Sequence, residues 1–146
     1  MELRRATPFD VSKVFNLLKQ MHSETKIRVS PINTKKLLDT INSAIHDGVV
    51  LLAEIKGKIV GSIGGMLGSD WWSSEKYLGD YWFYVRPESR NSKIAIKLVK
   101  AFIKIGNEAN VIVKLGHVYS GDIERKDSFF KRLGLVKAGS LYTEVK

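Results

Sequence analysis

Hydrophobic residues recur every three or four positions in four stretches of the chain, the spacing typical of helices with one buried face. Before the first stretch, Thr7 and Pro8 provide an N-cap residue and a proline at the first helical position. Gly48 and Gly134 directly follow the second and fourth stretches, where glycine commonly ends a helix. The predicted helices cover residues 8–21, 33–47, 92–106 and 122–133.

Runs of β-branched and aromatic residues between these helices have the length of strands. Two of the runs flank Gly57, which suits the tight turn of a hairpin. The second arm of this hairpin contains Gly61, Gly64, Gly65 and Gly68, so we expect a bulge there or the close approach of another backbone. The predicted strands cover residues 2–6, 49–55, 59–67, 77–86, 111–118 and 136–145.

The order of these elements predicts an α+β, or mixed α/β, fold with one sheet covered by helices. The helix at 92–106 connects the strands at 77–86 and 111–118, so we expect these two strands to be parallel. Ligands of such sheets bind beyond the carboxyl ends of the strands. A chain of this length builds one core well, and residues 1–146 are therefore expected to form a single domain.

The composition is that of an ordinary soluble domain, with 44% hydrophobic and 27% charged residues. No hydrophobic run is long enough to span a membrane, and residues 1–10 lack the hydrophobic region of a signal peptide. The absence of cysteine excludes disulfides, thiolate metal ligands and a cysteine nucleophile, and it agrees with a cytoplasmic location. His22 and His46 lack the paired spacing of metal ligands, so no metal is expected.

The net charge of +9 indicates an anionic partner, without distinguishing a nucleic acid from a phosphorylated cofactor or an acidic protein. Positive charge gathers at one turn, where Arg86, Arg90 and Lys93 surround Pro87 at the start of the third predicted helix. The N-terminus of a helix carries unpaired N–H groups and a partial positive charge. This turn is therefore suited to an anion such as a pyrophosphate.

The element order and two local motifs together resemble the GNAT superfamily of N-acetyltransferases over nearly the whole chain. The sequence FYVRPESRNSKIA at 83–95 is similar to the family's Val-x-Pro-x-x-Arg followed by Arg/Gln-x-x-Gly-x-Gly/Ala, and SFFKRLGL at 128–135 is similar to Phe-Tyr-x-x-x-Gly-Phe. The resemblance implies a mixed, mostly antiparallel sheet flanked by helices. In such a sheet two parallel strands splay apart and form the cleft for coenzyme A.

The resemblance also implies that acetyl-CoA is the cosubstrate. Its pyrophosphate is expected at the turn before the third helix, and its pantetheine arm along the strand edge at Phe83 and Val85, where this strand splays from Val118. The implied cofactor-binding residues are Phe83, Tyr84, Val85, Arg90, Asn91, Ser92, Lys93, Ile94, Ala95, Ser120 and Phe130.

Two positions depart from the family pattern. Lys93 stands where the family has glycine, which would weaken phosphate binding if the position requires a positive φ. Phe130 stands where the family often has the tyrosine that protonates the departing thiolate. Tyr119, Tyr84, Ser128 or water are candidates to replace that hydroxyl. Alternatively the thiolate leaves without being protonated. A thiol has a pKa of ~8.5, so its thiolate is an acceptable leaving group near neutral pH.

The implied reaction is direct attack, in a ternary complex, by a primary amine of a small molecule or a protein. The attacking amine must lose a proton, and Asp80 is the expected base. Alternatively, Asp80 is a carboxylate at the end of a strand that forms an ion pair with a nearby lysine. The Val85 amide is the expected hydrogen-bond donor to the developing oxyanion. Tyr119 completes the expected catalytic residues.

The acceptor is expected to contact Glu24, in the loop after the first helix, and the tryptophans Trp71 and Trp72. The tryptophans could equally hold a long loop in place or face another subunit, so a homodimer is considered. His117 alternates with hydrophobic residues and is expected to be a hydrogen-bonded core histidine, while its position near the strand end keeps a catalytic role as the alternative.

A second hypothesis keeps the fold without turnover, as a CoA-binding or nucleic-acid-binding module. The phenylalanine at position 130 and the charge of +9 favour it. Against it, the basic residues are spread along the chain and no nucleic-acid-binding motif interleaves them with aromatic residues. A nucleic acid is therefore not expected as a partner. A membrane surface is not expected either, because both early helices keep Asp, Asn or Ser among their lysines.

Overall fold

The computed structural model describes residues 1–90 and 92–145, and its main feature is one five-stranded sheet with helices on both faces. The strands are β1 (Glu2–Arg5), β2 (Val49–Ile55), β3 (Lys58–Ser69), β4 (Lys76–Val85) and β5 (Ile112–Lys114). The α-helices are α1 (Val11–Ser23), α2 (Thr34–Asp47), α3 (Ile94–Glu108) and α4 (Ile123–Arg132), and single 3-10 turns cover Pro8–Asp10 and Pro87–Ser89.

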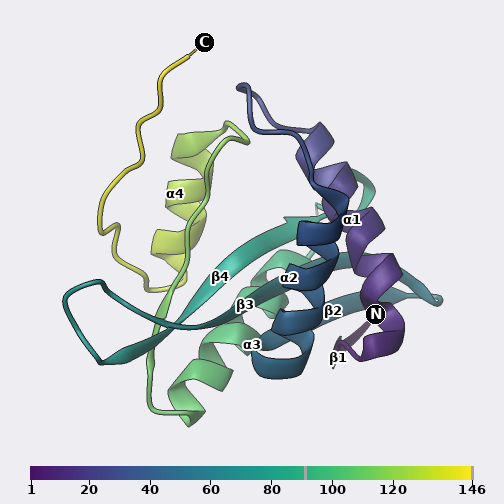
Figure 1. The fold of residues 1–146 in the computed structure, drawn as a ribbon, viewed down its shortest axis with the longest axis horizontal. Helices are drawn as coiled ribbons and strands as arrows, with labels where there is room; N and C mark the ends of the chain where they lie inside the picture. Colours follow the sequence, from purple (N-terminus) through teal and green to yellow (C-terminus); the bar gives the residue numbers. More distant parts are fainter. Residues whose placement is uncertain (91, 146) are drawn as a thin grey trace.

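The strands lie in the sheet in the order of the sequence, β1-β2-β3-β4-β5 (Figure 1). The first four are antiparallel to their neighbours, and β5 is parallel to β4. The predicted mixed sheet and its parallel pair are therefore confirmed. The parallel pairing is short and ends at Gly79 and Lys114.

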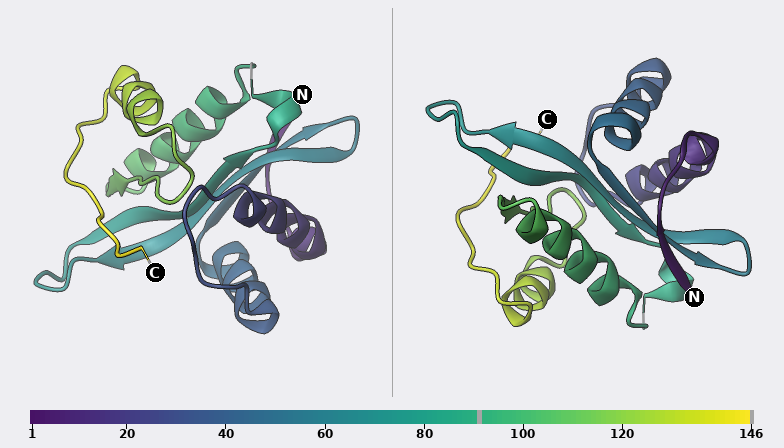
Figure 2. Two further views of the ribbon diagram at one scale, coloured as in Figure 1. Left: turned by 90° about the horizontal axis from the view of Figure 1, so that it is seen from above. Right: turned by 90° about the horizontal axis from the view of Figure 1, so that it is seen from below.

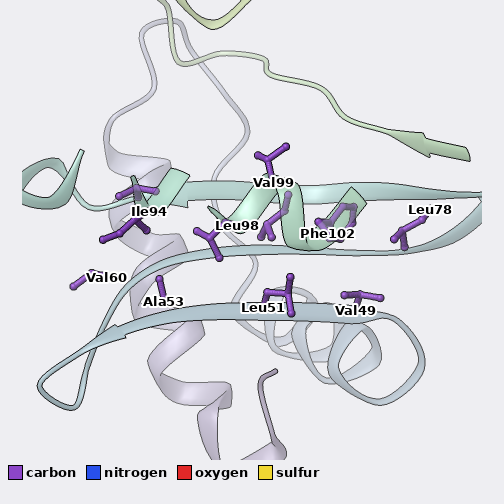
Figure 3. Packing of buried hydrophobic residues seen from close by; sticks show 11 residues of the cluster. Val49, Leu51, Ala53, Val60, Leu78, Ile94, Leu98, Val99 and Phe102 are labelled. Carbon is purple, nitrogen blue, oxygen red and sulfur yellow. The ribbon is translucent and has the colours of Figure 1, made fainter. Parts of the chain in front are cut away.

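Helices α1 and α2 cover one face of the sheet, and α3 and α4 cover the other (Figure 2). Side chains of β2 alternate between these two layers, as the period of a strand requires. Leu51 is buried in the cluster that includes Phe102 of α3, whereas Leu52 is buried in the cluster that includes Leu17 of α1. Figure 3 shows the α3 cluster, to which this helix contributes Ile94, Leu98, Val99 and Phe102.

Two predicted strands are wrong in extent or in kind. The strand expected at 111–118 is shortened to Ile112–Lys114, and residues 136–145 form no strand. β5 is the edge of the described sheet, so no neighbour pairs with its outer side. The hydrophobic residues of the final segment are exposed, with Val136 at 90% and Tyr142 at 91%. Strand propensity alone does not order a segment that has no partner strand.

The third helix also differs in extent from its prediction. It begins at Ile94 rather than at residue 92 and continues to Glu108. Pro87 instead begins the separate 3-10 turn that follows β4. The turn between β4 and α3 thus contains Arg90, Ser92 and Lys93, the last as the N-cap residue of α3.

A β-bulge divides β4 into two halves. Gly65 of β3 pairs with Asp80 and Gly64 pairs with Trp82, so Tyr81 has no partner in β3. An extra residue shifts the following side chains to the opposite faces of the sheet. This shift explains how Leu78 and Val85, an odd number of residues apart, are buried in the same cluster.

Two glycines of β3, Gly64 and Gly65, leave no space for a side chain because β4 packs directly against them. A Cβ on Gly64 would come within 2.3 Å of the Trp82 ring, and a Cβ on Gly65 would come within 1.9 Å of the Gly79 carbonyl oxygen. The predicted close backbone approach is therefore present at Gly65, and β3 has its own bulge at Val60, which has no partner in β2. The Trp82 indole donates to the Ser62 hydroxyl at 2.9 Å inside the core, which fixes the ring over Gly64.

Replacing Gly65 with alanine should lower the free energy of unfolding by about 2–3 kcal/mol, because the added methyl group meets backbone atoms that are held in the sheet. Urea unfolding of the purified variant measures this change. Gly68→Ala is the matched control, since a Cβ there has ordinary contacts of 3.5 Å with the Tyr77 ring. Equal stability of the two variants would contradict the close packing at the bulge.

Candidate active site

The carboxyl-terminal half of β4 has an open edge. The Arg86 amide donates to the Val60 carbonyl at 2.8 Å. Bonded and non-bonded residue pairs alternate along an antiparallel ladder. The register of β3 and β4 therefore turns the N–H and C=O groups of Phe83 and Val85 away from β3. β5 no longer pairs with β4 there, so these groups line the opening between the two strands.

Arg90 lies across this opening in the structure. Its Nε donates to the Val85 carbonyl at 2.8 Å, and one terminal nitrogen donates to a Glu24 carboxylate oxygen at 2.8 Å. The guanidinium carbon lies 5.3 Å from the centre of the Tyr84 ring. The Tyr84 hydroxyl donates to the other Glu24 oxygen. Arg90 and Tyr84, which were predicted to bind the cofactor, thus form one cluster with Glu24, which was predicted to contact the acceptor.

This cluster also affects Tyr84 as a proton donor. Burial is the main cause that raises the pKa of the Tyr84 hydroxyl, and its hydrogen bond to the Glu24 carboxylate raises it further. A phenol with a raised pKa holds its proton more tightly and is a weaker general acid. Tyr84 is therefore poorly suited to replace the hydroxyl that Phe130 lacks.

The turn before α3 presents the amides expected to bind an anion. The first turn of an α-helix leaves its N–H groups without partners in the helix. The Ile94 amide contacts the Ser92 hydroxyl at 3.3 Å, and Ala95 is the next residue of the helix. Lys93 has φ of −83°, so this position does not require glycine. Asn91 lies outside the described residues.

Phe130 lies in an aromatic group on the α4 side of the opening. Its ring centre is 6.3 Å from that of Phe83 and 5.9 Å from that of His117. His117 in turn contacts Asp127 of α4 through Nε2 at 2.8 Å. His117 is therefore the predicted hydrogen-bonded histidine, although its partner in α4 could not be named from the sequence.

The loop after β5 lies beside the loop after α1. The Tyr119 carbonyl accepts a hydrogen bond from the Lys26 amide at 2.7 Å. Tyr119 has φ of 67°, which is uncommon for a residue with a side chain. Its backbone thus joins the two loops, while a catalytic role for its side chain stays a prediction.

Lys126 is a residue of this region that the sequence analysis missed. It donates to the Ser120 hydroxyl, which is one of the predicted cofactor-binding groups. Burial lowers the pKa of the Lys126 ammonium, and the nearby positive charges of Arg90 and Lys26 lower it further, although Asp122 acts in the opposite direction. Lys126 belongs to a helix that contains several other charged residues of both signs, so no local pattern distinguishes it.

Asp80 is placed at the point where β4 and β5 separate. Its carboxylate accepts a hydrogen bond from the Gly116 amide at 3.1 Å. Burial raises the pKa of the Asp80 carboxyl to about 6, even though the Gly116 hydrogen bond lowers it. Asp80 also lines a hollow of about 340 Å³, together with Met66, Tyr77, Tyr81 and Lys114. We call this space the Asp80 hollow.

The described part of the structure does not pair Asp80 with a lysine, as its alternative role would require. Lys114, the lysine of this hollow, is bonded to Asp70 at 2.8 Å and lies 4.2 Å from the centre of the Tyr77 ring. Asp80 is bonded to a backbone amide instead. A carboxyl group with a raised pKa in a hollow is typical of a functional group rather than of a surface ion pair.

The two predicted acceptor-binding tryptophans lie at the turn between β3 and β4. Trp71 and Trp72 contact each other edge to face, with ring centres 5.2 Å apart. Their exposed fractions are 93% and 67%. Neither lines the Asp80 hollow, so their role in acceptor binding stays a prediction. Glu24, the third predicted acceptor residue, is bonded to Tyr84 and Arg90.

Two further observations concern the described part of the chain. None of its helices is both long enough and hydrophobic enough to cross a membrane. Within the same residues, no group of three or more acidic or histidine side chains is arranged to hold a metal ion.

The family of this chain follows from its sequence and agrees with the site. The family model of the acetyltransferase (GNAT) domain matches residues 46–136, more than half of the chain. The chain therefore belongs to the GNAT acetyltransferase family. A search of curated proteins finds no significant match.

Solved structures with the same fold cover nearly the whole chain. The aminoglycoside 6'-N-acetyltransferase AAC(6')-Ig from Acinetobacter haemolyticus is 12% identical, with a TM-score of 0.75 and coverage of 100% of this chain and 98% of that one. AAC(6')-Iy, bound to a bisubstrate analogue of CoA and acetylneamine, is 14% identical, with a TM-score of 0.77 and coverage of 99% and 97%. A Clostridium difficile 630 protein described as a possible acetyltransferase is 17% identical, with a TM-score of 0.75 and coverage of 99% and 96%.

The raised pKa of Asp80 should be measurable through protein stability. The folded protein holds this proton up to about pH 6, whereas an unfolded aspartic acid loses it near pH 3.8. Ionisation of Asp80 therefore destabilises the fold as the pH rises from about 4 to 6. The variant Asp80→Asn lacks this cost. Its stability relative to the unmodified protein should thus increase over this range by about 1–3 kcal/mol and level off above it.

Urea unfolding at pH 4, 5, 6 and 7 would give this relative stability. A difference between the two proteins that does not change with pH would show that Asp80 titrates normally. Asp127→Asn is a useful comparison, because bonds to His117 and Lys137 lower the pKa of Asp127. This titration lies below about pH 4, so the relative stability of Asp127→Asn should stay nearly constant from pH 4 to pH 7, whereas that of Asp80→Asn rises.

Proposed function

We propose that this protein is an acetyl-CoA-dependent N-acetyltransferase that acts on a primary amine. The observation that carries the proposal is the open edge of β4, where the backbone groups of Phe83 and Val85 have no partner strand between the end of the β4–β5 pairing, next to Asp80, and the turn that leads to α3. This arrangement offers hydrogen bonds for an extended amide-containing arm, an anion site at one end and a carboxylate at the other. The comparison with AAC(6')-Iy, whose structure contains a CoA analogue, supports this use of the fold.

The cofactor would be held mainly by backbone groups. The amides at the start of α3 are suited to the pyrophosphate, and Lys93 adds a positive charge at the N-cap. Phe83 and Val85 offer N–H and C=O groups to the pantetheine arm. Since Arg90 occupies the Val85 carbonyl here, it would have to release this oxygen for the arm to pair there. Such a movement would leave Arg90 available to a phosphate.

Acetyl-CoA would supply an acetyl group activated as a thioester. The amine nitrogen bonds to the carbonyl carbon, the carbon–sulfur bond breaks, and the sulfur leaves as a thiolate that is later protonated. The developing oxyanion requires an N–H donor, and both Phe83 and Val85 have one on the open edge. Val85 lies five positions after Asp80 along β4, a distance of up to about 16 Å that the bulge shortens. The Phe83 amide, only three residues away, is therefore the better donor for a reaction that also uses Asp80.

Asp80 would receive the proton of the attacking ammonium, directly or through water. With a pKa of about 6 it is ionised at neutral pH and is a stronger base than an ordinary aspartate. Phe130 has no hydroxyl to protonate the thiolate, and its ring packs among Phe83 and His117. A thiolate needs less assistance than an alkoxide or an amide leaving group, because its conjugate acid has a pKa of ~8.5.

A CoA-binding module without turnover is the second candidate. Phe130 is the observation that favours it. The two candidates share the cofactor site and differ in the need for Asp80, so binding and turnover must be tested separately.

Acetyl-CoA should raise the melting temperature of the protein, because a ligand at ~100 times its dissociation constant stabilises the folded state by about 2.7 kcal/mol. Lys93→Glu places a negative charge at the proposed phosphate site and should weaken binding at least tenfold. Lys97→Glu, one turn further along the exposed side of α3, makes the same charge change and should bind normally. Equal binding by both variants would place the phosphates elsewhere, and no response of any of the proteins would contradict the cofactor site.

Asp80→Asn should lower kcat by about 100- to 10,000-fold, the usual contribution of a general base. Its affinity for acetyl-CoA should be unchanged in the melting assay. In the unmodified protein, the rate should fall below about pH 6, as Asp80 becomes protonated. Normal binding of acetyl-CoA together with no transfer to any amine by the unmodified protein would favour the binding module.

A further inference from the structure

A second hollow adjoins the Asp80 hollow and extends along α2. Its volume is about 570 Å³, which is within the range of small-molecule sites. Thr40 and Ser43 of α2 line one side, and Met66 and Tyr81 of the sheet line the other. Met66 and Tyr81 also line the Asp80 hollow. We call this second space the α2 groove; the two hollows meet at this pair of side chains.

Tyr81 owes its position at this junction to the β-bulge. It is the residue of β4 without a partner in β3, and bulges redirect the side chains that they contain. Its neighbour Trp82 is buried, whereas Tyr81 is 59% exposed. The ring therefore stands between the carboxylate of the Asp80 hollow and the polar side of α2. A molecule that occupies both hollows must pass this ring.

The side chains that line the α2 groove carry no net charge. Two lysines, Lys35 and Lys36, are balanced by Asp39 and Asp47, and Lys35 is bonded to Asp39 at 2.8 Å. Hydroxyl and amide side chains make up the rest of the α2 side. This surface is therefore neutral, although the whole chain has a net charge of +9. Such a lining suits an uncharged, hydrogen-bonding molecule better than a nucleic acid, an acidic peptide or a polyamine.

We propose that the α2 groove binds the body of the acetyl acceptor, and that this acceptor is a primary amine on an uncharged body rich in hydroxyl or amide groups, such as an amino sugar. Its amine would reach past Tyr81 to Asp80. The inference rests on the proposed function, since it assigns the acceptor of the same site. It adds a specificity surface, formed by α2 and Tyr81, that lies outside the cofactor cleft.

The test compares two amines, glucosamine, which has a hydroxyl-rich body, and butylamine, which has none. Ser43 is exposed on the groove side of α2, and Ser43→Arg would fill the groove. Asn42→Arg adds the same charge at the neighbouring exposed position, which does not line the groove. The kcat/KM values for both amines are measured in each protein, along with the affinity for acetyl-CoA.

The unmodified protein and Asn42→Arg should prefer glucosamine. Ser43→Arg should lower kcat/KM for glucosamine at least tenfold and change that for butylamine less than twofold. Tyr81→Ala should also reduce the preference, because it removes the wall shared by the hollows. Comparing the ratio of the two amines between variants cancels their different basicity. Affinity for acetyl-CoA should be the same in all four proteins.

Three outcomes would overturn the inference. These are an unmodified protein that acetylates butylamine as well as glucosamine, a Ser43→Arg variant that retains the preference, and equal losses for both amines. Failure of the proposed function has a different signature: neither amine is acetylated by the unmodified protein, or acetyl-CoA does not bind. The melting temperature of each variant separates these outcomes from a loss of folding.

Discussion

The bulge in β4 is the constraint on which the arrangement of the site depends. It allows one strand to send Leu78 and Val85 into the core under α3 and Trp82 into the core under α1 and α2. The same extra residue separates Asp80 from the open half of the strand. Gly65 makes the bulge sterically feasible, because the β4 backbone approaches where its side chain would be. Core packing and site geometry therefore have a common origin.

The open edge of β4 is a consequence of unequal strand pairing. β3 pairs with every residue of β4 except Tyr81, whereas β5 pairs with only three residues. Buried backbone groups require hydrogen-bond partners. Here Arg90 supplies one of them to the Val85 carbonyl and is itself held by Glu24. The cluster thus satisfies part of the open edge with side-chain groups that a ligand could replace.

The sequence predicted the features that depend on local pattern. The spacing of Ile94, Leu98 and Phe102 was sufficient for α3, and the basic turn before it could be placed correctly. The strand at 136–145 was wrong, because a strand also requires a neighbour. The contact of Glu24 with Arg90 joins residues 66 positions apart. No periodicity records such a contact, and Lys126 escaped notice for the same reason.

The distribution of charge separates the two ends of the proposed site. Near Ser120, burial is the main cause that lowers the pKa of the Lys126 ammonium; Asp122 raises this pKa, and the charges of Arg90 and Lys26 lower it. A phosphorylated ligand would add negative charge beside these three cations. The α2 groove, in contrast, carries equal numbers of lysines and aspartates. This difference in charge agrees with the proposal that an anionic cofactor binds at one end of the site and an uncharged acceptor body at the other.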